Sequence, residues 1–192
     1  DLRVAIQGVG NVGMALGQML NQAGAKVIVA DICRANVEAA LNLFASESVE
    51  PGLIHKTPCT VFSPCGLSNV INDQSIDELG CLLIAGSANV QLSRPDLGKR
   101  LHDKGILYAP DYVINSGGLI YASLTHQYHL NSPSRSLGID QALRAAIQTK
   151  ISKIQLTLLD IFTRSYQEGL PTSDIADVMA IERLGLAKSK AA

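Results

Sequence analysis

The segment GVGNVG at residues 8–13 decides the fold because of what stands on either side of it. The apolar run before it, Leu2–Gln7, has the length of a strand, and apolar residues recur at helical spacing over residues 11–23. In this context the first glycine permits a tight turn, the second lets the backbone approach a pyrophosphate, and the third lets the helix pack close to the sheet. The segment therefore predicts a phosphate-binding turn, whose cofactor contacts are Gly8, Gly10, Asn11, Val12 and Gly13.

An acidic residue follows at the place where a dinucleotide fold uses one. A second apolar strand is predicted over Lys26–Ala30, and Asp31 comes directly after it. A carboxylate there accepts hydrogen bonds from the adenosine ribose and repels a 2′-phosphate, so it favours NAD over NADP. Arg34 is close enough in sequence to weaken that discrimination. The other open interpretation is a glycine turn in a fold that has lost its cofactor.

Strand-length apolar runs and helical patterns alternate along the first 112 residues. This alternation predicts an α/β fold of the Rossmann type, a doubly wound parallel sheet with helices on both faces. The further predicted elements are a helix around 37–44, a strand over 60–63, a short helix from 72 or 73 to 79, a strand over 81–85 that is buried on both faces, a helix over 94–104 and a strand over 106–108.

Beyond residue 112 only helical patterns follow. Helices are predicted over 113–130, over 139–167 and from about 173, with a polar turn at 131–136. At 1.5 Å per residue the second of these helices would be about 40 Å long. We therefore predict a Rossmann NAD-binding domain over 1–130 and C-terminal helices over 131–192 that pack on the same domain.

Composition excludes several classes of protein. The 192 residues include 16 Lys and Arg against 17 Asp and Glu, a net charge of −1, which leaves no basic field for a nucleic acid. The apolar runs are far too short to span a membrane. Four cysteines without a C-x-x-C pair indicate reduced thiols in a cytoplasmic protein. His126 and His129 have the spacing of a helical metal pair but lack nearby partners, so we predict no metal site.

Two further polar segments follow predicted strands. The sequence AGSANVQL occupies residues 85–92, and YAPDYVINSGG occupies residues 108–118. Open α/β sheets bind ligands at the carboxyl ends of their strands, where both segments are expected. Asn89 and Asn115 offer donors and acceptors suited to a carboxamide, although each could also be a turn or cap residue. Asp111 could be a catalytic acid or could hold the turn after Pro110.

Six stretches together resemble a known family. The chain is similar to the cofactor-binding domain of the glutamate/leucine/phenylalanine/valine dehydrogenases, with most similarity to the leucine and phenylalanine branch. The resemblance covers nearly the whole chain but only about half of such an enzyme. The matching stretches are VAIQGVGNVG at 4–13, VADI at 29–32, SPC at 63–65, VINDQSI at 70–76, IAGSAN at 84–89 and GILYAPDYVINSGGLI at 105–120.

The resemblance implies NAD-dependent oxidative deamination of an apolar L-amino acid to a 2-oxo acid and ammonia. In the family, an N-terminal domain supplies two lysines and an aspartate that act on the substrate, and the full-length enzyme is a homo-oligomer. None of those catalytic residues is in this sequence, so we expect the chain to bind NAD without turnover and to lack that N-terminal domain.

The resemblance also implies roles for individual residues of the cofactor site. The three glycines match the pyrophosphate turn, Asp31 matches the ribose acid, and Ile32 lies beside the adenine. Cys65 matches a cysteine in the loop around the ribose and nicotinamide. The segment along the nicotinamide and its carboxamide is matched by Ala88, Asn89 and Asn115, and the substrate side-chain pocket by Leu119 and Ala122.

Three departures from the family pattern bear on function. The family usually reads A-N-N where this sequence has Ala88-Asn89-Val90, and valine cannot donate the hydrogen bond that reaches the substrate. Ser116 replaces a small alanine, and residues 63–68 read SPCGLS in place of APCALG. Val90 is compatible with an altered substrate contact, a relocated contact or a homologue without activity. Two alternatives to a dehydrogenase therefore stay open: a nucleotide-sensing module and a non-catalytic homologue.

Overall fold

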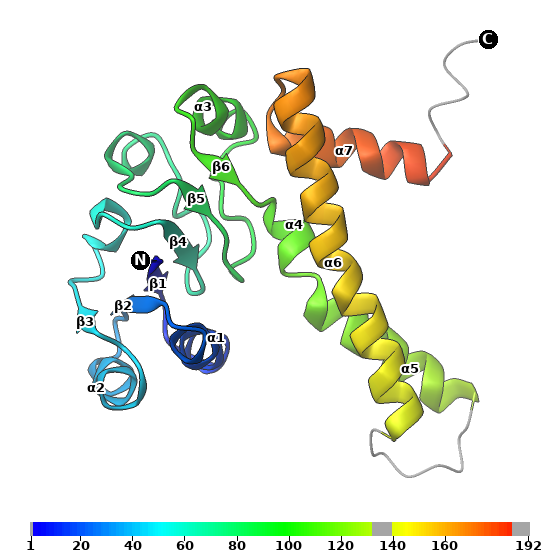
Figure 1. The fold of residues 1–192 in the computed structure, drawn as a ribbon, viewed down its shortest axis with the longest axis horizontal. Coiled ribbons are helices and arrows are strands. Elements are labelled where there is room, and N and C mark those ends of the chain that lie inside the picture. The colour runs from blue at the N-terminus through cyan, green and yellow to red at the C-terminus, as the bar shows by residue number, and fades with distance from the viewer. Residues whose placement is uncertain (1, 132–139, 186–192) are drawn as a thin grey trace.

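A parallel six-stranded sheet forms the first part of the molecule. The computed structural model describes residues 2–131 and 140–185. The strand order is β3-β2-β1-β4-β5-β6, with β1 and β4 at the centre (Figure 1). The strands are β1 (Arg3–Gln7), β2 (Lys26–Ala30), β3 (Glu47–Ser48), β4 (Val61–Pro64), β5 (Leu83–Ile84) and β6 (Leu107–Tyr108). This order reverses direction between β1 and β4, which confirms the predicted doubly wound α/β fold.

Helices connect the strands and then continue alone. They are α1 (Asn11–Gln22), α2 (Arg34–Leu43), α3 (Leu97–Asp103), α4 (Asp111–Ile114), α5 (Gly117–Asn131), α6 (Gln141–Glu168) and α7 (Thr172–Arg183), with 3₁₀ turns η1 (Ile54–Lys56) and η2 (Ser75–Glu78). Gly169 ends α6 in the left-handed conformation that glycine adopts without steric cost, at φ +66°.

Alternate residues of the central strands fill two separate cores. Ala5 of β1 and Ile28 of β2 face one core, together with Phe62 of β4. Val4 and Val27 face the other, on the side of the sheet that α1 and α2 cover. Both faces of β1 and β2 are therefore buried, as expected for central parallel strands. Packing on both faces therefore fixes the positions of the carboxyl ends of the central strands β1 and β4.

The predicted strand over 81–85 is shorter and less buried than expected. Only Leu83–Ile84 pairs as β5, and Leu82 is 69% exposed. On the side of α1, the face of β5 opens onto an apolar cavity of about 380 Å³. The prediction of burial on both faces is wrong there, because α1 lies over β1 and leaves part of this face uncovered. Sequence reasoning also missed β3, whose two exposed residues pair with Ile28 and Val29 but show no apolar pattern.

The helix predicted over 113–130 is two helices. The first, α4, ends at Ile114, and α5 begins at Gly117. The hydroxyl of Ser116 donates a hydrogen bond to the carbonyl of Val113 at 2.7 Å, and the main chain turns between the two helices. A serine side chain that satisfies a local carbonyl in this way competes with the helical backbone pattern.

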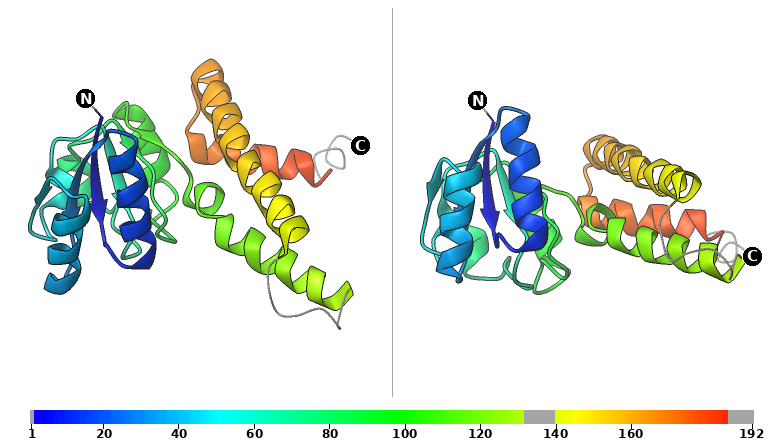
Figure 2. Two further views of the ribbon diagram at one scale, coloured as in Figure 1. Left: turned by 60° about the horizontal axis from the view of Figure 1, so that its bottom comes forward. Right: turned by 90° about the horizontal axis from the view of Figure 1, so that it is seen from below.

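The C-terminal helices lie beside the sheet domain rather than over it (Figure 2). Helix α6 packs on α4, α5 and α7, and α7 contacts α3 and β6. The hydroxyl of Thr172 donates to the carbonyl of Tyr108 at 2.7 Å, in a buried position. A Cβ at Gly98 would lie 2.4 Å from the hydroxyl oxygen of Ser173, so α3 and the start of α7 approach closely. The first turn of α7 is thus the anchor of this helical part on the sheet domain.

Candidate cofactor-binding site

A side chain would have a different effect at each of the three glycines of the turn. Gly8 has φ +91°, and a Cβ there would lie 2.7 Å from the Cα of Gly66. A Cβ at Gly13 would lie 2.0 Å from the carbonyl oxygen of Gly8. A Cβ at Gly10, in contrast, would meet nothing within 4 Å. The fold itself requires the first and third glycines, whereas the space beside Gly10 is open to a ligand.

The amino end of α1 points at that open space. Gly10 is the N-cap of the helix, and no side chain caps the first turn. Asn11 and Val12, the first two residues of the helix, are exposed. An uncapped helix start presents backbone N–H donors and the positive end of the helix dipole, which together suit a phosphate group. The turn therefore has the geometry of an anion site.

Asp31 is fixed at the end of β2 by two backbone hydrogen bonds. One carboxylate oxygen accepts from the amide of Val9 at 2.8 Å, and the other accepts from the amide of Cys33 at 2.7 Å. The first of these bonds ties Asp31 to the glycine turn, a link that the sequence did not reveal. Each oxygen retains a second lone pair for a ribose hydroxyl.

The neighbours of Asp31 differ in their availability to a ligand. Ile32 is 86% exposed, beside the ribose acid, where the resemblance expected a residue against the adenine. The Arg34 guanidinium pairs with Glu38 one turn along α2, with Nε and Oε1 3.0 Å apart. That ion pair directs the arginine along the helix, so it gives no support to the interpretation that Arg34 receives a 2′-phosphate.

Cys65 lies under the glycine turn, between the ends of β1 and β4. Its amide donates to the carbonyl of Gln7 at 2.7 Å, and its Sγ lies 3.4 Å from the hydroxyl oxygen of Ser63. Its Cβ is 3.5 Å from the position that a Cβ at Gly13 would take. The structure thus brings Cys65 to the same strand ends as the predicted phosphate contacts.

The two predicted asparagines meet. The side-chain amide of Asn115 donates to the side-chain oxygen of Asn89 at 2.6 Å, although the two residues come from different loops. Ala88, next to the first asparagine, is buried with only 5% of its surface exposed. We call Asn89 and Asn115 the asparagine pair. The side-chain nitrogen of Asn89 can still donate a hydrogen bond and the side-chain oxygen of Asn115 can still accept one. A carboxamide has one group that complements each of them.

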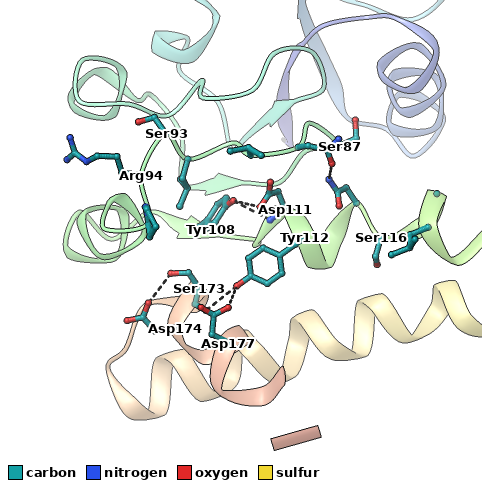
Figure 3. Close-up of a pocket in the computed structure, with 17 residues that line it drawn as sticks. Ser87, Ser93, Arg94, Tyr108, Asp111, Tyr112, Ser116, Ser173, Asp174 and Asp177 are labelled. Atoms are coloured by element: carbon teal, nitrogen blue, oxygen red, sulfur yellow. Dashed lines mark hydrogen bonds between the residues drawn. The ribbon is translucent and has the colours of Figure 1, made fainter. Parts of the chain in front are cut away.

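A cavity of about 910 Å³ adjoins the asparagine pair (Figure 3). Val90 and Leu119, two of the predicted substrate-pocket residues, line it, whereas Ala122 is exposed on α5 and does not. On the opposite wall, the Tyr112 hydroxyl donates to Asp177 of α7 at 2.8 Å, as Figure 3 shows. Partial burial, with the Asp177 carboxylate beside it, raises the pKa of Tyr112 above its usual range.

Val90 has a backbone conformation that valine rarely adopts. Its φ is +50°, in the left-handed region, and its side chain is 60% exposed. Its carbonyl accepts a hydrogen bond from the amide of Asn69 at 2.7 Å, and Asn69 is itself left-handed at φ +56°. Asparagine tolerates this region far better than a β-branched residue does. The position thus has a backbone geometry that suits asparagine, the residue that the resemblance leads us to expect there.

The carboxylate of Asp111 is already hydrogen-bonded to other groups of this chain. Its carboxylate accepts from the hydroxyl of Tyr108 and from the backbone amide of Gln91, at 3.2 and 3.3 Å. These bonds favour the structural interpretation of Asp111 over a catalytic acid. Gln91 is fully buried and was missed by sequence reasoning, because nothing in the pattern around a lone glutamine signals burial.

Two other features bear on the class of site. Within residues 2–131 and 140–185 no three histidine, cysteine or acidic side chains are grouped closely enough to bind a metal ion. In the same part of the chain, none of the helices combines the length and the apolar character needed to cross a membrane. All four cysteines are free thiols.

Comparison with known proteins agrees with the fold and the motifs. Residues 34–190 match the model of the family described as Glutamate/Leucine/Phenylalanine/Valine dehydrogenase. The chain belongs to this family. It is 41% identical over 181 residues to a leucine dehydrogenase of Thermoactinomyces intermedius, covering 94% of this chain and 46% of that protein. It is 39% identical to a phenylalanine dehydrogenase of the same organism over 184 residues, with the same two coverages.

A solved structure gives the same result for the fold. The L-tryptophan dehydrogenase from Nostoc punctiforme superposes with a TM-score of 0.84 and 36% identity, over 96% of this chain and 52% of that one. The predicted family and branch are therefore confirmed. The chain spans about half the length of the relatives it matches.

Proposed function

We propose that this chain binds NAD and forms the cofactor domain of a dehydrogenase that converts an apolar L-amino acid to a 2-oxo acid and ammonia. The observation that carries the proposal is the open space beside Gly10, because a Cβ there would meet no protein atom. Open space alone does not single out Gly10, but Gly10 is also the second glycine of a G-x-G-x-x-G turn that opens a helix, the position where a pyrophosphate approaches the backbone. The uncapped start of α1 adds donors of the right kind at the same place.

Each end of the site has its own task. The first-turn N–H groups of α1 bind the pyrophosphate, and Asp31 accepts hydrogen bonds from the ribose hydroxyls while it holds the turn through Val9. The asparagine pair, which lines the cavity, would hold the carboxamide by hydrogen bonds. Bound NAD would supply the hydride acceptor for the oxidation of the substrate.

The apolar wall of the cavity faces the substrate. Leu119 and Val90 lie on this wall, and an apolar pocket discriminates among side chains mainly by size. We further propose that the groups that move protons and bind the substrate carboxylate come from sequence outside this chain, and that the full-length enzyme is a homo-oligomer. On this proposal the chain alone has no turnover.

A cofactor titration tests the proposal. NADH is added to the chain and its fluorescence is followed, with NADPH in parallel. We expect saturable binding with NADH preferred. Asp31→Ala should narrow the preference by about tenfold, because hydrogen bonds to a charged group contribute about 1.5 kcal/mol or more.

The ratio of the two affinities is the decisive quantity. Asp31→Ala also frees the amide of Val9, which weakens the turn for both cofactors alike and cancels in the ratio. Asp103→Ala, which removes an exposed carboxylate on α3, is the matched control for net charge and should leave the ratio unchanged. Equal losses of NADH and NADPH affinity in Asp31→Ala would remove the ribose role from Asp31, and no binding of either cofactor would refute the proposal.

One observation favours a second candidate, a homologue that keeps the cofactor but has lost turnover. Val90 is hydrophobic at the position where the family usually carries the asparagine that reaches the substrate. Oxidation of apolar L-amino acids by the full-length protein, measured as NADH formation, separates the two: turnover eliminates the second candidate.

A further inference from the structure

Gln91 is the most deeply buried polar side chain near the site. None of its surface is exposed, and it lies among loops rather than in a helix or strand. Its side-chain nitrogen donates to the carbonyl of Gly86 at 2.9 Å and to the carbonyl of Ala88 at 3.0 Å. Its side-chain oxygen is buried without a hydrogen-bond partner. The two carbonyls fix which end of the amide is the nitrogen, because the oxygen in its place would face two acceptors.

The backbone of Gln91 joins two other loops. Its amide donates to Asp111 at 3.3 Å, and its carbonyl accepts from the amide of Ile71 at 3.0 Å. The segments that follow β4, β5 and β6 therefore meet at this one residue. Each of these segments begins at the carboxyl end of a strand, on the side of the candidate cofactor site.

The side-chain amide controls the peptide that carries Asn89. The carbonyl of Ala88 belongs to the same planar peptide unit as the amide of Asn89, so a donor on that carbonyl sets the direction of the unit. On the other side of the loop, the amide of Ala88 donates to the carbonyl of Pro64 at 2.9 Å. A Cβ at Gly86 would lie 2.2 Å from that same carbonyl oxygen, so the loop is pressed against the end of β4.

We propose that Gln91 is a positioning residue, whose buried amide holds residues 86–88 so that Asn89 meets Asn115. It touches neither cofactor nor substrate and acts through the asparagine pair alone. This inference rests on the proposed function for its ligand, but the hydrogen bond of the pair can be measured without any ligand. The glycine turn and Asp31 lie outside the contacts of Gln91, which makes the prediction selective.

Two ligands separate the ends of the site. ADP-ribose uses the pyrophosphate turn and the ribose acid but has no nicotinamide, whereas NADH uses both ends. In Gln91→Leu, which keeps the volume but donates nothing, we expect the NADH affinity to fall about fivefold, the effect of one lost hydrogen bond. The ADP-ribose affinity should stay within about twofold of the wild-type value. Gln91→Asn, which keeps the amide but shortens its reach, should lie between the two and serves if the leucine variant does not fold.

A variant that is destabilised elsewhere in the fold is the control, because it separates misplacement of Asn89 from a general loss of stability. Phe44→Leu trims a buried side chain at the end of α2 that packs against Gly17 of α1, in the core on the other side of the sheet from Gln91's partner Ile71. It should lower the unfolding midpoint while leaving the ratio of NADH to ADP-ribose affinity unchanged. A Gln91 variant that lowers both affinities equally, or neither, would overturn the positioning role.

A spectroscopic measurement keeps the inference apart from the proposed function. The side-chain amide signal of Asn115 in a ¹⁵N–¹H spectrum, identified by its loss in Asn115→Ser, reports the hydrogen bond to Asn89 in the chain without cofactor. We expect this signal to move in both Gln91 variants and to stay in place in Phe44→Leu. An unmoved signal refutes the inference even if NADH binds, and a moved signal supports it even if NADH binding fails.

Discussion

Substitutions of Gly10 and Gly13 by alanine should have opposite consequences, although the two glycines are only three residues apart. In Gly13→Ala the new methyl group would lie 2.0 Å from the carbonyl oxygen of Gly8, far inside contact distance. That oxygen belongs to the turn backbone and cannot rotate away. Overpacking of this kind costs about 1–3 kcal/mol, and here the upper end applies. Alanine regains about 1 kcal/mol of helix propensity, so the free energy of unfolding should fall by about 2 kcal/mol.

Gly10→Ala should leave the fold intact and abolish tight cofactor binding. The residue has φ −72°, which alanine adopts readily, and the methyl group would meet no protein atom. The N-cap preference for glycine over alanine and the lower entropy of the unfolded chain nearly cancel, so the change in stability should stay within about 0.5 kcal/mol. The methyl group would occupy the path of the pyrophosphate, and the NADH affinity should fall at least tenfold, or about 1.4 kcal/mol.

Two measurements on each variant check this reasoning. Urea unfolding followed by far-ultraviolet circular dichroism gives the stability, and the NADH titration gives the affinity. A Gly10→Ala variant with wild-type NADH affinity would refute the assignment of the open space to a ligand. A Gly13→Ala variant as stable as the wild type would show that α1 can move away from the turn, and it would contradict the argument that Gly8 and Gly13 must lie in close contact.

Four further results are expected. Val90→Asn should raise the free energy of unfolding by about 1 kcal/mol in urea, because asparagine tolerates the left-handed backbone; an unchanged midpoint would contradict the strain at φ +50°. Thr172→Val should cost about 1–2 kcal/mol in the same assay, because the buried carbonyl of Tyr108 loses its donor, and a smaller loss would mean that α7 is not anchored there. Burial raises the pKa of the Cys81 thiol to about 12, so a thiol reagent should modify the exposed Cys33 first and Cys81 only on unfolding. Because the Cys81 thiol loses its proton at a lower pH in the unfolded chain than in the folded one, the free energy of unfolding should fall as the pH rises from the ordinary thiol pKa toward 12. Unfolding midpoints measured above pH 9 test this expectation.

The first strand, the glycine turn and the first helix could be predicted from sequence because their signals are local. The predicted strand over Lys26–Ala30 agrees with β2 at both ends, and the predicted helix over 11–23 differs from α1 by one residue. Each depends on a periodicity that neighbouring residues carry themselves. The short strand β3 could not be found in this way, because its two exposed residues become a strand only by pairing with β2.

The same distinction separates the predicted site residues from the missed ones. Asn89 and Asn115 were singled out because both follow strands, but their direct hydrogen bond depends on a loop geometry that no spacing encodes. Val90 was noted as a departure in side-chain chemistry, whereas its left-handed backbone appears only in three dimensions. Gln91 gave no signal at all, since a polar residue in a polar segment is expected at the surface.

The two ends of the candidate site should therefore respond differently to mutation. The hydrogen bonds of the phosphate end lie within the first 33 residues, in one turn and a carboxylate that holds it, and Cys65 and Gly66 pack against that turn, so single changes there act on the turn directly. The asparagine end is assembled from the loops after three strands, which meet at one buried glutamine. On the proposed role of Gln91, we expect a change in any of those loops to reach the asparagine pair through that shared contact, even where the altered residue lies outside the cavity. If NAD binds as proposed, we therefore predict that distant substitutions selectively lower affinity at the asparagine end alone, because a polar side chain that the fold buries completely connects its loops.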